Sequence, residues 1–394
     1  FLPAFFGFGP DWPNTAFPAP GPNLPPGSGA PVSQVQPPPP ASGQSVVDVL
    51  SSDFVNPLVH QAQLVIEREI VPNWSVSASY LMSRANHLTV FTDTNLGAPS
   101  GTQTFAIFDT AGNIVQTFSQ PLITQRLDPT LGVIQTGQSV INSWYHAFIF
   151  QVNKRFSQGF QLNVNYTVSK TTDDGQVSGG GGTFAGTISV PNPGNLRDES
   201  ALSRLDVRNR LVVSGLWELP WKHSDTMAAR VLLDGWGLST IWRIRDGFPF
   251  SANVDDSDNA CPLGGLNGGF TCGAISSFGG AADVRLPTIG RNTFTGPGLA
   301  NVDIRISRTI YIGESTHWQF TYEVFNLFNR VNVNGIETDA FEFIEPGDPF
   351  DNLPGTCTFG DGCLEPRLDF QQVRSTSNRI NRARDMQFGL KLIF

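Results

Sequence analysis

The sequence has few charged residues and no long apolar run, and each absence narrows the kind of protein it can encode. Only 15% of its 394 residues are Asp, Glu, Lys or Arg, against about a quarter in an average soluble domain. The formal net charge of −9 gives no sign of a nucleic-acid-binding surface. No apolar run approaches the ~18 residues of a membrane-spanning helix, although strands of a membrane barrel carry only a weak alternating signal.

Cysteine and histidine are also scarce. The four cysteines form two close pairs in glycine-rich sequence, Cys261 with Cys272 and Cys357 with Cys363. No histidine lies near either pair, so two short-range disulfides are favoured over a metal site. Disulfides indicate an oxidising compartment. The five histidines are scattered without metal spacing, and no cofactor is expected.

Catalytic signatures are missing as well. The glycine run 179–182 is not followed by the Lys and Ser or Thr of a phosphate loop, and no nucleophile elbow is present. Asp255, Asp256 and Asp258 are weak Ca²⁺ candidates because their spacing does not match an EF-hand loop. A solvated acidic loop is the favoured interpretation, and we expect the chain not to be an enzyme.

The chain is rich in residues that suit strands and loops, with 30 Phe, 40 Gly and 29 Pro. Residues 1–57 are rich in Pro, Gly and Ser and are predicted to be an irregular segment. The sequence starts at Phe1 without an initiator Met or a signal segment. We therefore expect a fragment or a processed product.

From residue 58 onward, apolar and polar residues alternate with the period of two that is typical of a β-strand with two unlike faces. A small additional hairpin is predicted around 104–109 and 113–118. The strands are predicted at 58–70, 74–84, 144–156, 160–170, 204–219, 235–250, 300–310, 317–328 and 385–394.

The connections between these nine strands run short, long, short, long, medium, long, short and long. A transmembrane barrel has this parity because its short turns lie at the periplasmic rim and its long loops at the outer surface. A soluble β-sandwich mixes connection lengths without such a rule. The parity therefore favours an antiparallel transmembrane β-barrel with long extracellular loops.

Polar exceptions on the apolar face are sorted by depth. Arg68, Lys154 and Arg308 lie near short turns, while His146 and Lys170 lie toward long loops. A charge facing lipid costs about 2–4 kcal/mol at mid-bilayer but about 0–1 kcal/mol near the interfaces. The apolar face is therefore predicted to contact lipid. The other face is predicted to line the lumen with Glu67, Glu69, Arg208, Arg210, Arg243, Arg245, Asp303, Arg305 and Glu323.

Several stretches resemble a known family. The segments "SWYHAFIFQVNKRFSQGFQLNVNYTVSKTTDD", "RLDVRNRLVVSGLWELPW", "GWGLSTIWRIRDGFPF", "GRNTFTGPGLANVDIRISRTI" and "FTYEVFNLFNRVN" resemble the C-terminal barrel of TonB-dependent outer-membrane receptors of the Oar-like type. The resemblance covers most of residues 55–394. The closing "FGLKLIF", with Phe388, Leu390, Leu392 and Phe394, resembles the signal strand that the barrel-assembly machinery recognises.

The resemblance implies energised uptake of a large, unidentified ligand across the outer membrane of a Gram-negative cell. It implies a plugged barrel of about 22 strands, of which this chain supplies about nine as its C-terminal portion, residues 58–394. The TonB complex would act through a plug that is not recognisable in this chain. A periplasmic C-terminus places residues 1–57 outside the cell as an extracellular loop.

Three alternatives to the transporter remain open: a non-energised porin, a barrel-anchored surface adhesin and a secreted β-sandwich. A non-energised porin or a barrel-anchored surface adhesin would show the same strands, and a plug domain in the upstream sequence would distinguish the transporter from both. A secreted β-sandwich binding protein is the third alternative. A full-length protein that stays soluble without detergent would support that third alternative.

Overall fold

The structure is a computed structural model, and all its regular elements in the described residues are β-strands. All described residues belong to the compact unit Gln44–Phe394. Within them, no helix has the length and apolar character needed to cross a membrane. The described residues are 47–95, 97–122, 125–131, 134–175, 199–219, 234–255, 284–286, 288–311, 316–344, 346–359, 362–376 and 383–394.

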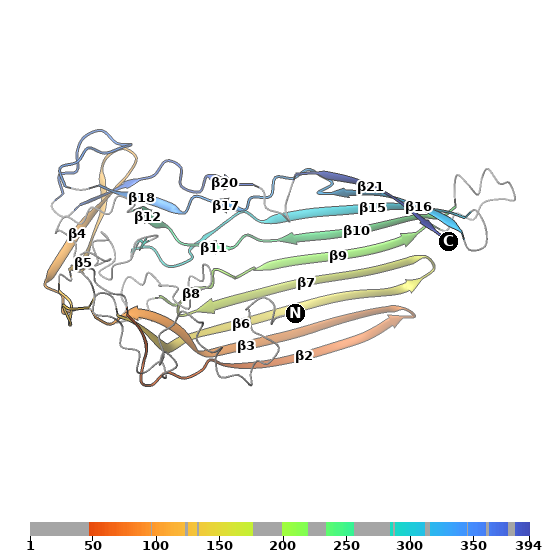
Figure 1. Cartoon of the computed structure of the whole chain (residues 1–394), viewed down its shortest axis with the longest axis horizontal. Helices are drawn as coiled ribbons and strands as arrows, with labels where there is room; N and C mark the ends of the chain where they lie inside the picture. The colour runs from red at the N-terminus through yellow and green to blue at the C-terminus, as the bar shows by residue number, and fades with distance from the viewer. Residues whose placement is uncertain are drawn as a thin grey trace, which may run out of the picture. The chain divides into compact units, whose positions relative to one another are not determined.

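The main sheet has 11 strands, of which nine lie side by side as an antiparallel path in chain order (Figure 1). Each of the nine predicted strands corresponds to one of them, so the predicted all-β fold is confirmed. Within the described residues the sheet does not close, and β2 and β21 are its edges. The strands are β2 (Leu58–Val71), β3 (Trp74–Asp93), β6 (Ile134–Ser157), β7 (Phe160–Asp173), β9 (Asn209–Glu218), β10 (Trp236–Arg245), β15 (Leu299–Tyr311), β16 (His317–Phe325) and β21 (Asp385–Ile393).

Several strand boundaries differ from the predicted ones. β3 and β6 continue past the predicted limits and pair with each other as far as Asp93 and Gln135. β9 begins at Asn209 rather than 204, because the chain turns just before it, where Asp206 N–H donates to the Ser203 carbonyl at 2.9 Å. β16 ends at Phe325, because Asn326 adopts a left-handed backbone with φ 51°.

The short turns are built from residues that accept positive φ. Asn73 has φ 71° between β2 and β3, and Gln158 and Gly159 have φ 52° and 73° between β6 and β7. Positive φ at both central residues is the geometry of a type I′ hairpin turn, which matches the strand twist. A Cβ at Gly159 would also collide with the Glu218 carbonyl, so both conformation and space require glycine there.

The register places like residues in rows across the sheet. Val164 in β7 lies opposite Val152 in β6 and Val213 in β9, while Asn165 lies opposite Gln151 and Val212. In the described chain, no layer packs on the apolar rows. Ile66 is 68% exposed, Phe148 55% and Leu390 59%. An apolar surface of this extent needs an apolar environment to cover it.

The buried core lies in the long connections instead. Segments from three of them form one six-stranded sheet with two buried apolar clusters, one around Phe105 and Leu364 and one around Ala106 and Ile344. The predicted small hairpin is present as β4 and β5. The strands, in sheet order, are β13 (Val284–Arg285), β12 (Asn253–Asp255), β18 (Asp339–Ile344), β19 (Cys363–Pro366), β4 (Gly101–Phe108) and β5 (Ile114–Leu122).

The remaining strands are short. β1 (Val47–Leu50) pairs in parallel with the start of β6, which corrects the prediction that residues 1–57 are irregular throughout. Backbone hydrogen bonding to an available strand overrides the loop-like composition here. β8 (Ala201–Leu202) pairs with β7. β11 (Pro249–Phe250) pairs with β14 (Phe294–Thr295), and β17 (Gly335–Ile336) pairs with β20 (Val373–Ser375). The predicted strand 235–250 is therefore two elements.

Candidate functional site on the polar face and at the strand ends

The polar face of β10 and β15 is organised around Asp303. Its Oδ2 accepts a hydrogen bond from Arg243 Nη2 at 2.8 Å. Its Oδ1 accepts from Asn301 Nδ2 at 2.8 Å and from the Asn326 backbone N–H at 2.9 Å. One carboxylate therefore joins β10, β15 and the segment that follows β16.

That segment is held by asparagine side chains. Asn326 Oδ1 accepts from Arg330 N–H at 3.0 Å, and its Nδ2 donates to the Arg330 carbonyl at 2.9 Å. The Leu327 N–H donates to the Val302 carbonyl at 2.8 Å. Asparagine tolerates a left-handed backbone and bonds locally, so the "FNLFN" stretch ends β16 and binds it to β15.

A second ion pair lies nearer the short turns. Arg305 Nε donates to Glu323 Oε1 at 2.6 Å, directly across β15 and β16. The Arg305 side chain is 54% exposed, so we assign the pair no more than about 1 kcal/mol in water. Glu67 and Glu69 lie on the exposed edge strand β2, where Glu69 accepts from Asn73 N–H at 3.0 Å. Arg208 is exposed just before β9.

A pocket of about 760 Å³ lies at the long-loop end of β9, β10 and β15. Three of the predicted lumen residues, Arg210, Arg243 and Arg245, line it, together with apolar side chains of Phe248, Phe250, Leu299, Val333 and Ile336. Arg210 and Arg245 lie opposite each other in neighbouring strands. The Arg245 guanidinium stacks on the Phe248 ring with 4.1 Å from Cζ to the ring centroid.

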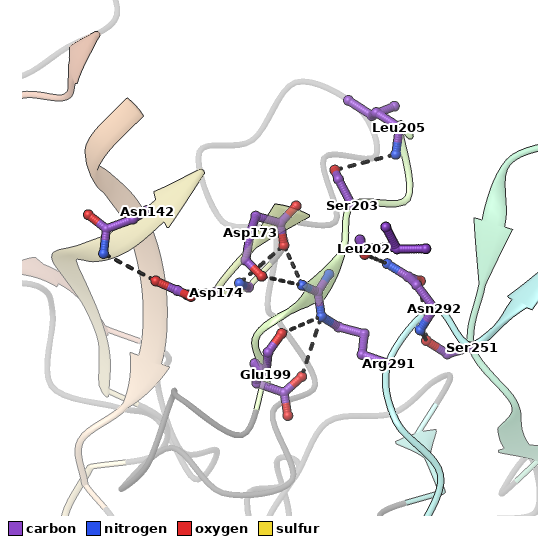
Figure 2. Close-up of polar contacts among 11 residues, drawn as sticks. Asn142, Asp173, Asp174, Glu199, Leu202, Ser203, Leu205, Ser251, Arg291 and Asn292 are labelled. Atoms are coloured by element: carbon purple, nitrogen blue, oxygen red, sulfur yellow. Dashed lines mark hydrogen bonds and ion pairs between the residues drawn. The ribbon is translucent and has the colours of Figure 1, made fainter. Parts of the chain in front are cut away.

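A buried ion network holds the end of β7 and was not predicted from the sequence. Figure 2 shows Arg291 between Asp173, the last residue of β7, and Glu199, which precedes β8. Arg291 contacts the Asp173 carboxylate and donates from Nη2 to its carbonyl at 2.9 Å. Nε donates to the Glu199 carbonyl at 2.9 Å and lies 3.8 Å from Oε2. All three side chains are buried.

The neighbouring Asn292 extends the same attachment. Its Nδ2 donates to the Leu202 carbonyl at 2.7 Å, and its N–H donates to Ser251 Oγ at 2.9 Å (Figure 2). Residues that are far apart in sequence thus fasten β8 and the segment before β14 to the end of β7. No periodicity or motif marks Arg291 and Asn292 as partners of these residues, which is why the sequence pattern could not identify them.

On the apolar face, Lys154 lies in a polar and aromatic cage beside the turn from β6 to β7. Its ammonium donates to the carbonyls of Ser157 and Phe160, each at 2.9 Å, and to Ser157 Oγ at 2.8 Å. The ring centroids of Trp74 and Phe160 lie 5.9 and 5.6 Å from Nζ. Only 7% of the residue is exposed. Arg308 has a similar arrangement, with Cζ 4.8 Å from the Trp236 ring centroid.

Polar groups mark the opposite end of the same face. Tyr80 Oη hydrogen-bonds His146 Nδ1 at 2.7 Å, and Tyr166 Oη donates to Asn209 Oδ1 at 2.8 Å. His146 and Lys154 lie eight residues apart on β6, which is about 26 Å along a strand. A tilt near 40° reduces this to a height of about 20 Å, close to the ~25 Å apolar band of outer-membrane barrels.

The remaining predicted site residues lie in the connections or at the sheet edge. Cys357 and Cys363 form the expected disulfide in the second apolar cluster, whereas Cys261 and Cys272 lie outside the described residues. Asp256 and Asp258 also lie outside them, and only the backbone of Asp255 is described, in β12. Among the described residues, no group of three or more His, Cys, Asp or Glu could hold a metal ion.

The C-terminal residues Phe388, Leu390 and Leu392 lie on one face of the edge strand β21, with Phe394 just beyond it. In the last long connection, Asp369 accepts hydrogen bonds from Arg367 at 3.1 Å and from Arg374 at 2.9 Å. The hydrogen bonding from the Arg367 side chain lowers the pKa of the Asp369 carboxyl below its ordinary value. This carboxylate therefore stays ionised while it holds the connection together.

Comparison with known proteins identifies a family for this chain. No curated protein matches the sequence. Among solved structures, the outer membrane transporter YddB from Escherichia coli is similar, with a TM-score of 0.42 and 9% identity, over 74% of this chain and 31% of that one. The chain thus spans less than a third of that transporter. A family described as an outer membrane beta barrel domain matches residues 9–360. The chain therefore belongs to the outer membrane beta barrel domain family and is an outer-membrane protein.

Proposed function

We propose that this chain supplies nine neighbouring wall strands of a TonB-dependent outer-membrane transporter of the Oar-like type. The apolar face contacts lipid, and the polar face lines the lumen through which a large ligand is taken up. The observation that carries this proposal is the difference between adjacent rows of the sheet: Val164 lies between two valines, whereas the next row pairs Asn165 with Gln151.

The placement of charge supports this orientation. On the polar face, Arg243 of β10 pairs diagonally with Asp303 of β15. On the apolar face, Lys154 and Arg308 lie close to the short turns and beside aromatic rings. A lumen hydrates or pairs charge, whereas the centre of a bilayer penalises it by about 2–4 kcal/mol.

The open sheet supports a barrel larger than nine strands. The edges β2 and β21 expose unpaired backbone groups, and such groups cannot remain unpaired in lipid. Further strands must pair with them. A barrel of about 22 strands encloses a lumen that needs a plug to remain impermeable, which is consistent with energised rather than passive transport.

Planar bilayer recording on the full-length protein tests transporter against porin. A plugged transporter is expected to give no stable conductance, whereas a porin gives steady open steps. The second measurement is binding to the purified periplasmic domain of TonB, which a transporter requires. Steady conductance without TonB binding would refute the transporter proposal and support the porin.

The proposal includes two further partners and no catalytic step. Outer-membrane lipid covers the exposed apolar rows, and the barrel-assembly machinery recognises β21 through its alternating apolar residues. Deletion of 385–394 from the full-length protein is expected to prevent assembly. Normal amounts of folded protein in the outer membrane after this deletion would contradict the role assigned to β21.

A further inference from the structure

We propose that the pocket at the long-loop end of β9, β10 and β15 binds a ligand with an anionic group attached to an apolar, aromatic body. This inference deepens the proposed function, since it rests on the polar face lining a lumen that ligands enter. The pocket of about 760 Å³ falls within the ~300–1,000 Å³ of typical small-molecule sites.

The charge of the pocket is the first reason. Arg210 and Arg245 are directly opposite in the β9–β10 pair, and like charges in that position repel. Arg243, two residues from Arg245, is neutralised by Asp303. Within the described part of the chain, neither Arg210 nor Arg245 forms an ion pair with a carboxylate. An anion that bridges the two guanidinium groups would remove this repulsion and bind two forked donors.

The apolar wall is the second reason. Phe248 stacks on the Arg245 guanidinium and is itself 42% exposed. Stacking fixes the guanidinium plane. Arg245 Nη1 donates to the Asp246 carbonyl at 3.0 Å, and the remaining N–H groups can donate to an anion. Val333 and Ile336 line the same pocket. A ligand with an aromatic body would cover these apolar groups, which an inorganic ion cannot do.

The pocket is held by structure that is already present in the free chain. Phe250 lies 5.6 Å from Phe294 between ring centroids, across the β11–β14 pair, and Phe370 packs against both rings. A Cβ at Gly247 would collide with the Gly296 backbone, so the two segments touch directly. Binding to a preformed wall avoids most of the ordering cost.

The test uses the full-length protein in lipid nanodiscs and isothermal titration calorimetry with naphthalene-2-sulfonate. The matched cation 2-naphthylmethylammonium tests the role of charge, and inorganic phosphate tests the role of the aromatic body. We expect the sulfonate to bind, the cation not to bind, and phosphate to bind at least tenfold more weakly than the sulfonate. Higher salt should weaken sulfonate binding.

The variants separate the pocket from general surface charge. Arg210→Gln and Arg245→Gln should each weaken sulfonate binding about tenfold, the loss expected for one charge-assisted contact. Arg208→Gln removes the same charge from the same face, just outside the pocket lining, and should leave binding unchanged. Phe248→Ala should weaken binding of the sulfonate more than binding of phosphate.

The inference is overturned if the sulfonate does not bind, if both pocket variants bind as the parent does, or if Arg208→Gln weakens binding equally. Its failure can be distinguished from failure of the transporter proposal. If the sulfonate binds in a charge-dependent way but the protein does not bind TonB, the pocket is retained and the transporter proposal fails. TonB binding with unaltered sulfonate affinity in both variants would retain the transporter and remove the pocket.

Discussion

At the scale of single residues, Lys154 shows how a charge is accommodated on an apolar face. The sequence predicts that this lysine lies near a turn, but it does not predict the acceptors and aromatic rings that surround its ammonium group. Four acceptors, the carbonyls of Arg155, Ser157 and Phe160 and the Ser157 hydroxyl, surround the ammonium. Lys154 therefore stabilises the turn between β6 and β7 through these hydrogen bonds, and is more than a charge that the apolar face can accommodate.

Replacing this lysine tests that role. Lys154→Met should destabilise the barrel by about 1–3 kcal/mol, because it leaves turn carbonyls without their donor. The matched control is Lys170→Met, at an exposed position of β7 on the same face of the sheet as Lys154. It should change stability little. Urea unfolding of the full-length protein in lipid vesicles measures both. Equal midpoints for the two variants would show that the cage contributes nothing.

The two faces of β7 can be tested at adjacent residues. Val164→Arg should impair assembly, because it places a charge near mid-bilayer at a cost of about 2–4 kcal/mol. Asn165→Arg should be tolerated, because residue 165 lies on the polar face opposite Gln151, where water can hydrate the charge. The measurement is the folded fraction in the outer membrane, from heat-modifiable migration. Similar losses in both variants would contradict the assignment of the faces.

At the scale of elements, polar networks attach the long connections to the ends of the strands, and the network around Arg291 is buried. Arg291 joins the end of β7 to β8 and to the segment before β14 (Figure 2). Asp303 does the same for β10, β15 and the end of β16. These two networks lie at strand ends, where backbone groups leave the sheet and need other partners.

The Arg291 network predicts a local defect. Arg291→Met should destabilise the surrounding connections by about 3–5 kcal/mol, because two carboxylates remain buried without their cation. Insertion of the strands should be unaffected, since their register does not depend on this residue. Proteinase K digestion of the full-length protein should cleave the connections faster, and Arg291→Lys should restore part of the protection. Unchanged cleavage in Arg291→Met would refute a fastening role.

At the scale of the whole molecule, the buried apolar clusters lie in the loop sheet, while the main sheet leaves its apolar rows uncovered. This distribution is inverted relative to a soluble domain, in which the largest sheet covers the core. The outer membrane accounts for the inversion, because lipid replaces the missing layer. The edges β2 and β21 need further strands for the same reason.

The open edges predict the behaviour of the isolated unit. Residues 44–394 expressed without other strands should aggregate, since two long edges remain available for pairing with other copies. The full-length protein should assemble in the outer membrane under the same conditions. Size-exclusion chromatography in detergent and membrane fractionation measure the two outcomes. A monomeric, protease-resistant unit 44–394 would show that the sheet is complete without additional strands.

Much of the fold could be predicted because alternation is a local property. All nine wall strands and the small β4–β5 hairpin follow from it, although β3 and β6 extend further than their alternation indicates and β9 starts later. The candidate site could be predicted from the sequence only in part. The polar-face residues could be named, but the pairing of Arg243 with Asp303 depends on strand register.

The sequence by itself determined which residues share a face, where the turns fall and that charge avoids the middle of the apolar face, because each depends on neighbours along the chain. Only the tertiary structure decided that Arg291 meets Asp173 and Glu199, that three long connections build one sheet, and that two arginines face a common pocket. Such contacts join residues that are distant in sequence. No local pattern encodes them, since their free energy arises only once the strands have paired and the connections have been brought together.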